Sequence, residues 1–332
     1  MKKIALLAHD YNLNTVFSEK YYNWIRNNGE LVIYEGDEAS FADKAKVLDF
    51  VKGANIIITS WGSPKIDADI LEVCPDLELV VHAAGTPKPI ITDALIEKKI
   101  PVTNSAIALG EGVAETALGF AISACKHFYW LSNDTKNKLW AHNKKLLKDF
   151  YDITVGVVSG GYVGRHMIKL LQNFNVDVLL YDPTMTAEQV AALGATKAEL
   201  NDMISKSDII TIHAPAIPAT EKMFNAENIP LIKDGAILIN TSRGVVIDEL
   251  ALIEELKKNR FYACLDVTDP EPPALDNPLR DMENVILTPH IAGAVTNGLK
   301  RIAKHVCEEI DRHCNGEPLR TPVNMDNLNK IA

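Results

Sequence analysis

The segment Thr154–Gly164 constrains the fold of this chain more than any other stretch. It reads Thr-Val-Gly-Val-Val-Ser-Gly-Gly-Tyr-Val-Gly, and an apolar pattern with helical spacing continues over Val163–Leu171. The segment therefore predicts a strand, a tight turn and a helix. In a dinucleotide fold, such a turn lets backbone N–H groups and the positive end of the helix meet a pyrophosphate. An ordinary loop between a strand and a helix is the alternative, because glycines also gather in such turns.

The glycines approximate the pattern G-x-G-x-x-G without matching it fully. Gly161 and Gly164 have the spacing of the second and third glycines, whereas Ser159 stands in the first position with Gly160 beside it. The serine is expected to alter the turn and to weaken cofactor binding. The predicted phosphate contacts are six consecutive residues: Ser159, Gly160, Gly161, Tyr162, Val163 and Gly164. No Lys-Ser/Thr pair follows Gly161, which excludes a Walker phosphate loop.

An acidic residue follows the next predicted strand. Asn175–Tyr181 ends at Asp182, which lies 18 residues beyond Gly164. A carboxylate at that position binds the hydroxyls of the adenosine ribose and repels a 2′-phosphate, so NAD is favoured over NADP. Because Pro183 follows, a solvated turn aspartate is the alternative interpretation.

Length and charge limit the possible partners. At 332 residues, 47% of them hydrophobic, the chain is long enough for two hydrophobic cores. Its formal net charge of −10 argues against nucleic acid or an anionic membrane as a partner, because phosphates would be repelled on average. We interpret the cluster Lys144, Lys145 and Lys148 as a solvated helix face.

Cysteine usage and the N-terminal residues indicate a compartment. Five cysteines form no Cys-x-x-Cys pair, and their odd number does not suggest a disulfide framework. We expect reduced thiols and a cytoplasmic location. The short apolar run after Met1-Lys2-Lys3 predicts a core strand rather than a signal sequence, and no run approaches the length of a membrane span. We predict no metal site.

The rest of the chain alternates apolar strands with helices, which is typical of parallel sheets covered on both faces. Before the glycine turn we predict strands at Ile4–Ala8, Leu31–Tyr34, Asn55–Thr59, Leu77–His82 and Ile100–Thr103, and helices at Thr15–Asn28, Ala42–Lys52 and Ala108–Cys125. After it we predict strands at Asp208–His213, Gly235–Asn240 and Val285–Leu287, and helices at Glu249–Lys258, capped by Asp248, and Ala294–Cys314. Phe128–Phe150, which contains Trp130 and Trp140, is predicted to be helical and to lie at an interface.

This order predicts an α/β protein with two doubly wound parallel-sheet domains. Residues 1–105 are expected to form the first part of a substrate domain, and residues 106–293 a cofactor domain inserted into it. Residues 294–332 would form a helix and tail that return to the substrate domain.

Three polar residues stand at the ends of apolar strands or in the loops after them. Arg243 follows Ala-Ile-Leu-Ile-Asn-Thr-Ser, Glu271 lies in Asp-Val-Thr-Asp-Pro-Glu-Pro-Pro, and His290 lies in Leu-Thr-Pro-His-Ile-Ala-Gly. Hydride transfer at a carbinol carbon needs a base for the hydroxyl proton, a cation for a carboxylate or carbonyl, and a group that tunes the base. Taken singly, Arg243 also fits a surface ion pair, Glu271 a solvated turn and His290 a cap at a strand end.

Three motifs carry a family resemblance. They are Ile-Asn-Thr-Ser-Arg-Gly at 239–244, Leu-Asp-Val-Thr-Asp-Pro-Glu-Pro at 265–272 and Thr-Pro-His-Ile-Ala-Gly at 288–293. They closely resemble the D-isomer-specific 2-hydroxyacid dehydrogenase family, and the resemblance extends from about Asn55 to Gly293. It implies a flavodoxin-like substrate domain, a Rossmann cofactor domain, an active site in the cleft between them and a homodimer formed through the cofactor domains. The implied activity is NAD-dependent interconversion of a D-2-hydroxy acid and its 2-keto acid.

The resemblance also implies roles for individual residues. His290 would be the acid/base, Glu271 its partner, and Arg243 the group that binds the substrate's carboxylate and carbonyl. Because Glu271 would stabilise the imidazolium, Glu271→Gln is expected to shift the pH profile of keto-acid reduction to lower pH. The implied cofactor contacts are Asp182 at the adenine ribose, Asp266 at the nicotinamide, and His213, Pro215, Thr241, Arg243, His290 and Gly293 along the cofactor cleft. Without the resemblance, His213 would be interpreted as a core histidine.

The substrate loop departs from the family pattern Gly-x-Gly-x-Asp and suggests an atypical branch. Here the stretch is Ala83-Ala84-Gly85-Thr86-Pro87-Lys88, in which Pro87 offers no N–H group to a carboxylate. Lys88 would favour a second anionic group or be merely solvated, and Trp61 would stand at the cleft mouth or be buried in its lobe. The predicted substrate contacts are Trp61, Ala84, Gly85, Thr86 and Arg243. The identity of the 2-hydroxy acid stays open.

A second class of function remains possible at this point. Some proteins that resemble this family serve mainly as NAD(H)-responsive binding or co-repressor modules with little turnover. The presence of Arg243, Glu271 and His290 together favours the enzyme.

Overall fold

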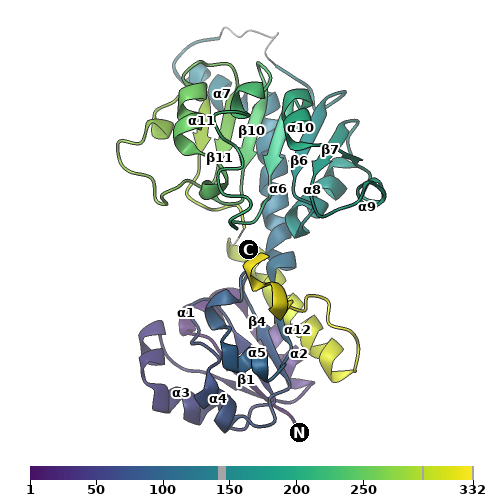
Figure 1. The fold of residues 1–332 in the computed structure, drawn as a ribbon. Helices are drawn as coiled ribbons and strands as arrows, with labels where there is room; N and C mark the ends of the chain where they lie inside the picture. The colour runs from purple at the N-terminus through teal and green to yellow at the C-terminus, as the bar shows by residue number, and fades with distance from the viewer. Residues whose placement is uncertain (141–146, 294, 331–332) are drawn as a thin grey trace. The chain divides into compact units, whose positions relative to one another are not determined.

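Two parallel sheets organise the chain, one in each of two structural units (Figure 1). The computed structural model describes residues 1–140, 147–293 and 295–330. The first unit comprises residues 1–109 and 294–332, and the second comprises residues 110–293.

The first unit contains a five-stranded sheet in the order β2-β1-β3-β4-β5, with every neighbouring pair parallel. Its strands are β1 (Lys3–Leu7), β2 (Glu30–Ile33), β3 (Ile56–Thr59), β4 (Leu79–His82) and β5 (Val102–Asn104). Its helices are α1 (Asp10–Val16), α2 (Glu19–Arg26), α3 (Lys44–Val51), α4 (Ala68–Val73), α5 (Asp93–Glu97) and α12 (Lys300–Cys314). This strand order confirms the flavodoxin-like expectation.

Helices cover both faces of that sheet because successive side chains of a strand point to opposite sides. Ile4 and Leu6 of β1 pack in a cluster with apolar residues of α1, α2 and α12. Ala5 and Leu7 of the same strand pack in a second cluster with residues of α3, α4 and α5. The fully apolar strands of the sequence are thus explained by burial on both sides.

The second unit contains a seven-stranded parallel sheet in the order β12-β11-β10-β9-β6-β7-β8. Its strands are β6 (Thr154–Val158), β7 (Asp177–Tyr181), β8 (Thr196–Lys197), β9 (Ile209–Ile212), β10 (Ile237–Asn240), β11 (Tyr262–Leu265) and β12 (Val285–Leu287). Its helices are α6 (Ala106–Cys125, which begins in the first unit), α7 (Phe128–Lys136), α8 (Tyr162–Leu171), α9 (Ala187–Ala191), α10 (Leu200–Lys206) and α11 (Glu249–Leu256). From β8 to β11 this is the Rossmann strand order, as predicted.

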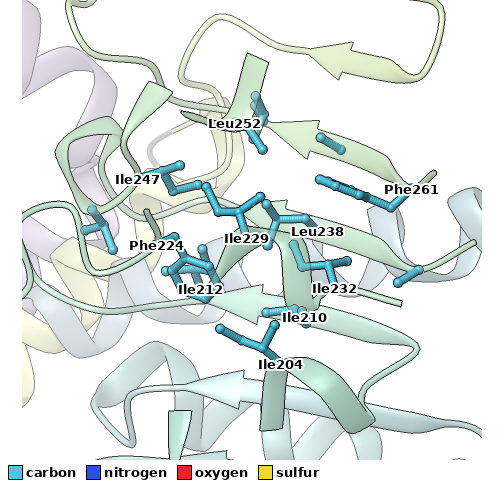
Figure 2. Close-up of a cluster of buried hydrophobic side chains, with 14 of the residues drawn as sticks. Ile204, Ile210, Ile212, Phe224, Ile229, Ile232, Leu238, Ile247, Leu252 and Phe261 are labelled. Carbon is cyan, nitrogen blue, oxygen red and sulfur yellow. The ribbon is translucent and has the colours of Figure 1, made fainter. Parts of the chain in front are cut away.

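Two clusters of buried side chains fill the two faces of the second sheet. Figure 2 shows the cluster between the strands and helices α10 and α11, in which Ile210, Ile212 and Leu238 of the sheet lie among residues such as Ile204, Leu252 and Phe261. On the other face, Val155 and Ile209 pack against residues of α6 and α8. The short 3-10 helices are η1 (Glu38–Ala42), η2 (Lys88–Ile90), η4 (Ile229–Leu231), η5 (Gly244–Val246), η6 (Pro278–Arg280), η7 (Thr296–Leu299) and η8 (Met325–Lys330).

The single helix predicted at Thr15–Asn28 is wrong. The structure has two helices, α1 and α2, because Phe17 and Ser18 between them are extended, with ψ of 172° and 167°. Phe17 is only 2% exposed and joins the core cluster with α12. The break therefore lets a large apolar side chain enter the core.

Two other helix predictions need correction. Phe128–Phe150 is helical only to Lys136, and residues 147–150 form no helix; residues 141–146, which include Lys144 and Lys145, lie outside the described residues. Lys148 is not on a solvated helix face, because its Nζ lies 3.1 Å from Asp208 Oδ1. The helix expected at Ala294–Cys314 begins as an α-helix only at Lys300, after η7, and Ala294 also lies outside the described residues.

Helix α6 is long and apolar. It has 20 residues, and its most apolar window has a mean hydropathy of 1.3, so by length and composition alone it could cross a membrane. The expectation that no run approaches a membrane span is therefore wrong for this helix. Its Ala114, Ala117, Ala121 and Ala124 are fully buried in the core of the second unit, so packing accounts for much of its apolar composition.

Candidate active site

The predicted site residues of the second unit follow the carboxyl ends of its strands. The glycine turn follows β6, Asp182 follows β7, His213 follows β9, and Asp266 follows β11. Thr241 and Arg243 come after β10, and His290 after β12. Because these strands are all parallel, their carboxyl ends share one edge of one sheet. Ligands of open α/β sheets bind at this edge.

The predicted strand, turn and helix are present, with a serine in the first position of the glycine pattern. Ser159 has a φ of 78°, in the left-handed region, and its N–H group donates to Tyr181 O at 2.8 Å. Gly161 precedes the first turn of α8. A Cβ on Gly164 would lie 1.9 Å from Ser159 O, so only glycine allows the helix to approach the strand this closely.

Ser159→Gly is expected to raise the free energy of unfolding by about 0.5–1 kcal/mol. A left-handed serine carries a steric cost of about 1–2 kcal/mol that glycine lacks, partly offset by the greater freedom of glycine in the unfolded chain. Scanning calorimetry should show a higher Tm. Ser205→Gly within α10 is the control and should lower the Tm. An unchanged or lower Tm for Ser159→Gly would contradict the strain at Ser159.

Asp182 is hydrogen-bonded to the glycine turn. Its Oδ2 accepts a hydrogen bond from Gly160 N at 2.7 Å, and its Oδ1 accepts from Thr184 N at 2.8 Å and Thr184 Oγ1 at 2.6 Å. The side chain is 8% exposed, so the interpretation as a solvated turn residue is wrong. Burial raises the pKa of this carboxyl, but the hydrogen bonds outweigh burial and the net pKa is lowered. Asp182 is therefore an ionised group that would repel a 2′-phosphate.

His290 and Glu271 form a direct pair. The distance between His290 Nδ1 and Glu271 Oε1 is 2.6 Å, with side-chain exposures of 45% and 39%. The backbone N–H of His290 donates to Asp266 O and Thr288 O, both at 3.0 Å. Because Nδ1 faces Glu271, Nε2 is the ring atom available to exchange a proton with a ligand.

Asp266 holds the loop that carries His290. The residue is 1% exposed, and its Oδ1 accepts hydrogen bonds from Thr288 Oγ1 at 2.5 Å and Ile291 N at 2.9 Å. Oδ2 accepts from Ala292 N at 2.8 Å. This structural role was not predicted from the sequence, because the partners lie more than 20 residues further along the chain.

Arg243 is exposed at the start of η5. Its Nη1 donates to Ser242 O at 2.7 Å, and Asn240 Nδ2 donates to Arg243 O at 3.0 Å. Within the part of the chain that the structure describes, no carboxylate pairs with the guanidinium. The group is thus positioned by backbone contacts and has donors left for an anionic ligand.

Two buried polar atoms near this edge lack hydrogen-bond partners among the described residues, His213 Nδ1 and Thr241 Oγ1. His213 Nε2 lies 3.0 Å from Thr211 Oγ1, and burial lowers the pKa of His213 to about 3, so the ring is neutral. A buried polar atom without a partner costs about 1–3 kcal/mol. These atoms therefore fit a site that is completed by a polar ligand.

The remaining predicted cofactor residues occupy the same set of loops. Tyr162 and Val163 are the first residues of α8, and Tyr162 is 43% exposed. Pro215 lies in the loop after β9 and accepts a hydrogen bond from Thr220 Oγ1. A Cβ on Gly293 would lie 3.1 Å from the Val113 side chain of α6, which makes this position tight.

The predicted substrate loop belongs to the first unit. Ala84 is fully buried, Gly85 is partly buried, and Thr86 Oγ1 is buried without a partner among the described residues. Lys88 is exposed. Trp61 follows β3 and is 37% exposed, and its carbonyl accepts a hydrogen bond from Asn12 Nδ2 at 2.7 Å.

His82 directly precedes this loop and was not among the residues predicted from the sequence. It is 2% exposed, and its Nδ1 lies 2.9 Å from Thr59 Oγ1. Burial lowers the pKa of His82 to about 4. Its position at the last residue of β4 is the sequence signal that could have found it.

Acid is expected to destabilise the first unit through His82. The ordinary pKa of histidine is about 6.5, so the unfolded chain takes up this proton before the folded one as the pH falls. The free energy of unfolding should then drop between about pH 6.5 and 4, by up to about 3 kcal/mol. Urea unfolding at pH values across this window should show a shallower drop for His82→Gln than for the wild type. Equal slopes would contradict the buried neutral histidine.

Comparisons with known proteins show what the chain is similar to. Residues 118–292 match the family described as D-isomer specific 2-hydroxyacid dehydrogenase, NAD binding domain. The chain is 31% identical to a D-3-phosphoglycerate dehydrogenase of Methanocaldococcus jannaschii over 89% of its own length, but it spans only 56% of that relative. It is 30% identical to a glyoxylate reductase of Korarchaeum cryptofilum, covering 93% of both chains.

A solved structure shows the same fold. The crystal structure of a phosphoglycerate oxidoreductase from Rhizobium etli superposes with a TM-score of 0.83 at 23% identity, covering 98% of this chain and 99% of the other.

Proposed function

The chain belongs to the D-isomer-specific 2-hydroxyacid dehydrogenase family, and on that premise we propose that it interconverts a D-2-hydroxy acid and its 2-keto acid with NAD as cofactor. The observation that carries the proposal is the 2.6 Å pair of His290 and Glu271 on the same sheet edge as the glycine turn. A histidine in contact with a carboxylate is suited to general acid–base catalysis.

The residues of this edge fit a dinucleotide. The turn at residues 159–164 would present the start of α8 to a pyrophosphate, since the N–H groups of Ser159 and Gly160 already donate within the protein. Asp182 would bind the ribose hydroxyls beside it. The unpartnered His213 Nδ1 and Thr241 Oγ1 would gain partners when the site fills. The bound dinucleotide would supply or accept the hydride. Asp266 is proposed to lie at its nicotinamide end.

The catalytic residues would bind the charged groups of the substrate and transfer a proton to it. Arg243 would bind the carboxylate and carbonyl of the keto acid through its fork of N–H donors. His290 would donate a proton from Nε2 to the forming alkoxide, while Glu271 holds Nδ1 and stabilises the imidazolium. We propose Trp61, Ala84, Gly85 and Thr86 as the substrate contacts of the first unit.

The test is a turnover assay that follows NADH and NADPH oxidation with a panel of 2-keto acids. The panel includes glyoxylate, pyruvate, hydroxypyruvate, phenylpyruvate, 2-ketoglutarate and a phosphorylated keto acid. Turnover with NADH would support the proposal, and the preferred acid would name the substrate. Measurable NADH binding without turnover on any acid would reject the dehydrogenase and favour an NAD(H)-responsive binding module.

We also propose a homodimer that uses the second unit. Five large apolar side chains on and after α7 are exposed: Phe128 (57%), Tyr129 (49%), Leu139 (56%), Trp140 (85%) and Tyr151 (65%). Exposed apolar side chains that lie together in one patch are typical of an interaction surface, and we propose that these five form one. Light scattering should give twice the mass of the chain, and Phe128→Asp should yield monomer. A wild-type protein that stays monomeric at micromolar concentration would reject the dimer.

A cytoplasmic location is inferred from the cysteines. All five are free thiols, and four of them are buried. Reduced cysteines are typical of the cytoplasm.

A further inference from the structure

The loop that carries Glu271 is exposed, although its contact with His290 is close. Of residues 269–276, all but Pro273 are exposed. An exposed segment with few buried contacts opens readily. A 2.6 Å contact between Glu271 and His290 therefore requires anchors at the ends of this loop.

Glu249 joins both ends of the loop to one helix. It is the first residue of α11, and its Oε2 accepts a hydrogen bond from Asp269 N at 3.3 Å. Its Oε1 accepts from Asn277 Nδ2 at 2.7 Å. Asn277 is 9% exposed, and its Oδ1 accepts from the N–H of Leu279, a core residue. One carboxylate thus connects the two loop ends to α11 and to the core.

Further contacts restrict the loop between those ends. A Cβ on Gly244 would lie 2.1 Å from the carbonyl carbon and oxygen of Thr268, so the backbone of η5 touches the start of the loop. Thr268 Oγ1 donates to Pro270 O at 2.8 Å. Arg280 donates from Nε to Ala274 O at 2.9 Å and from Nη2 to the Pro273 carbonyl at 2.7 Å. Glu249 is the side chain that anchors both ends of the loop.

We propose that Glu249 is a positioning residue for the reaction, because it fixes the ends of residues 269–276 and so holds Glu271 against His290. It acts through Glu271 and needs no contact of its own with the reacting atoms. The proposal rests on the proposed function, in which the pair of Glu271 and His290 carries the proton transfer.

The structure allows a test in which donor and acceptor are exchanged. Glu249→Gln leaves one oxygen for two donors, Asp269 N and the Asn277 amide, so one of these contacts is lost whichever way the new amide turns. Asn277→Asp places two carboxylates 2.7 Å apart. Each single variant therefore breaks a contact at one end of the loop. In the double variant the new amide donates to the new carboxylate, while its oxygen still accepts from Asp269 N. The pair is restored with its polarity reversed.

Each single variant is expected to lower kcat about two- to tenfold, which corresponds to the loss of one hydrogen bond. The KM for NADH should not change, because neither residue belongs to the cofactor loops. The double variant should recover kcat to within about twofold of the wild type. Glu271→Gln combined with Glu249→Gln should lose little more than Glu271→Gln alone, since both act through one group. Glu254→Gln on the same helix, where Glu254 pairs with Lys257, is the matched control and should keep wild-type kcat.

Hydrogen exchange supplies a readout that does not depend on turnover. Peptides covering residues 269–276 should exchange faster in both single variants and at the wild-type rate in the double variant. Wild-type kcat and exchange in the single variants would overturn the proposal. So would a double variant that recovers thermal stability without recovering kcat. If the wild type reduces no keto acid, the proposed function fails, and the exchange data still decide whether Glu249 holds the loop.

Discussion

His290→Ala is expected to lower kcat for keto-acid reduction by about 10²–10⁴-fold, the usual contribution of a positioned general acid. The loss should fall on kcat because the ring supplies a proton in the transition state. NADH affinity, measured by fluorescence titration, should stay close to that of the wild type, since the glycine turn and Asp182 are untouched.

A second histidine–carboxylate pair offers the matched control. His313 Nε2 lies 3.1 Å from Glu78 Oε2 in the first unit. His313→Ala removes a similar, part-buried pair and should leave kcat within about twofold, because neither residue belongs to the proposed active site. A His290→Ala enzyme with near wild-type kcat would remove His290 from the mechanism.

Arg243→Ala is expected to lower kcat/KM by about 10²–10³-fold. The guanidinium would make charge-assisted hydrogen bonds to the substrate's carboxylate and to the developing oxyanion, and the loss of one such donor costs about 3–4 kcal/mol. Steady-state kinetics with saturating NADH measure the effect. KM for the keto acid should rise along with the fall in kcat, because the same group binds the ground state.

Arg243→Lys separates charge from geometry. Lysine keeps the positive charge but lacks the planar fork, so this variant should recover only part of the loss. Arg26, which pairs with Glu19 on the surface of α2, is the control, and Arg26→Ala should keep wild-type kinetics. Full activity of both Arg243 variants would show that another group binds the carboxylate.

Much of the fold could be predicted because the signals are local. The strand Ile56–Thr59 is entirely buried, and its unbroken apolar run already indicated a parallel sheet with both faces covered. The turn at Gly161 and Gly164 likewise marks a strand, turn and helix through backbone requirements alone. The prediction of a single helix failed at Phe17. There α1 ends because the Phe17 side chain packs in the core, a contact that the local sequence does not report.

The motifs predicted His290 and Glu271 as partners, and the structure brings them to 2.6 Å. The residues that hold this pair in place were not predicted in that role. Asp266, which grips the backbone at Ile291 and Ala292, was expected to serve only the cofactor. The contact of Gly244 with Thr268 joins positions 24 residues apart, and no local pattern reports such packing.

The return of the chain to its first unit has a consequence for how the protein is made. Ile302, Val306 and Ile310 of α12 are fully buried against β1, β3 and β4. During synthesis those strands must wait for all of residues 110–293 before their cover emerges, a delay of roughly 10–40 s at typical elongation rates. The second unit, whose residues are contiguous, can fold within that interval. The N-terminal strands, although synthesised first, are therefore among the last elements to complete their packing.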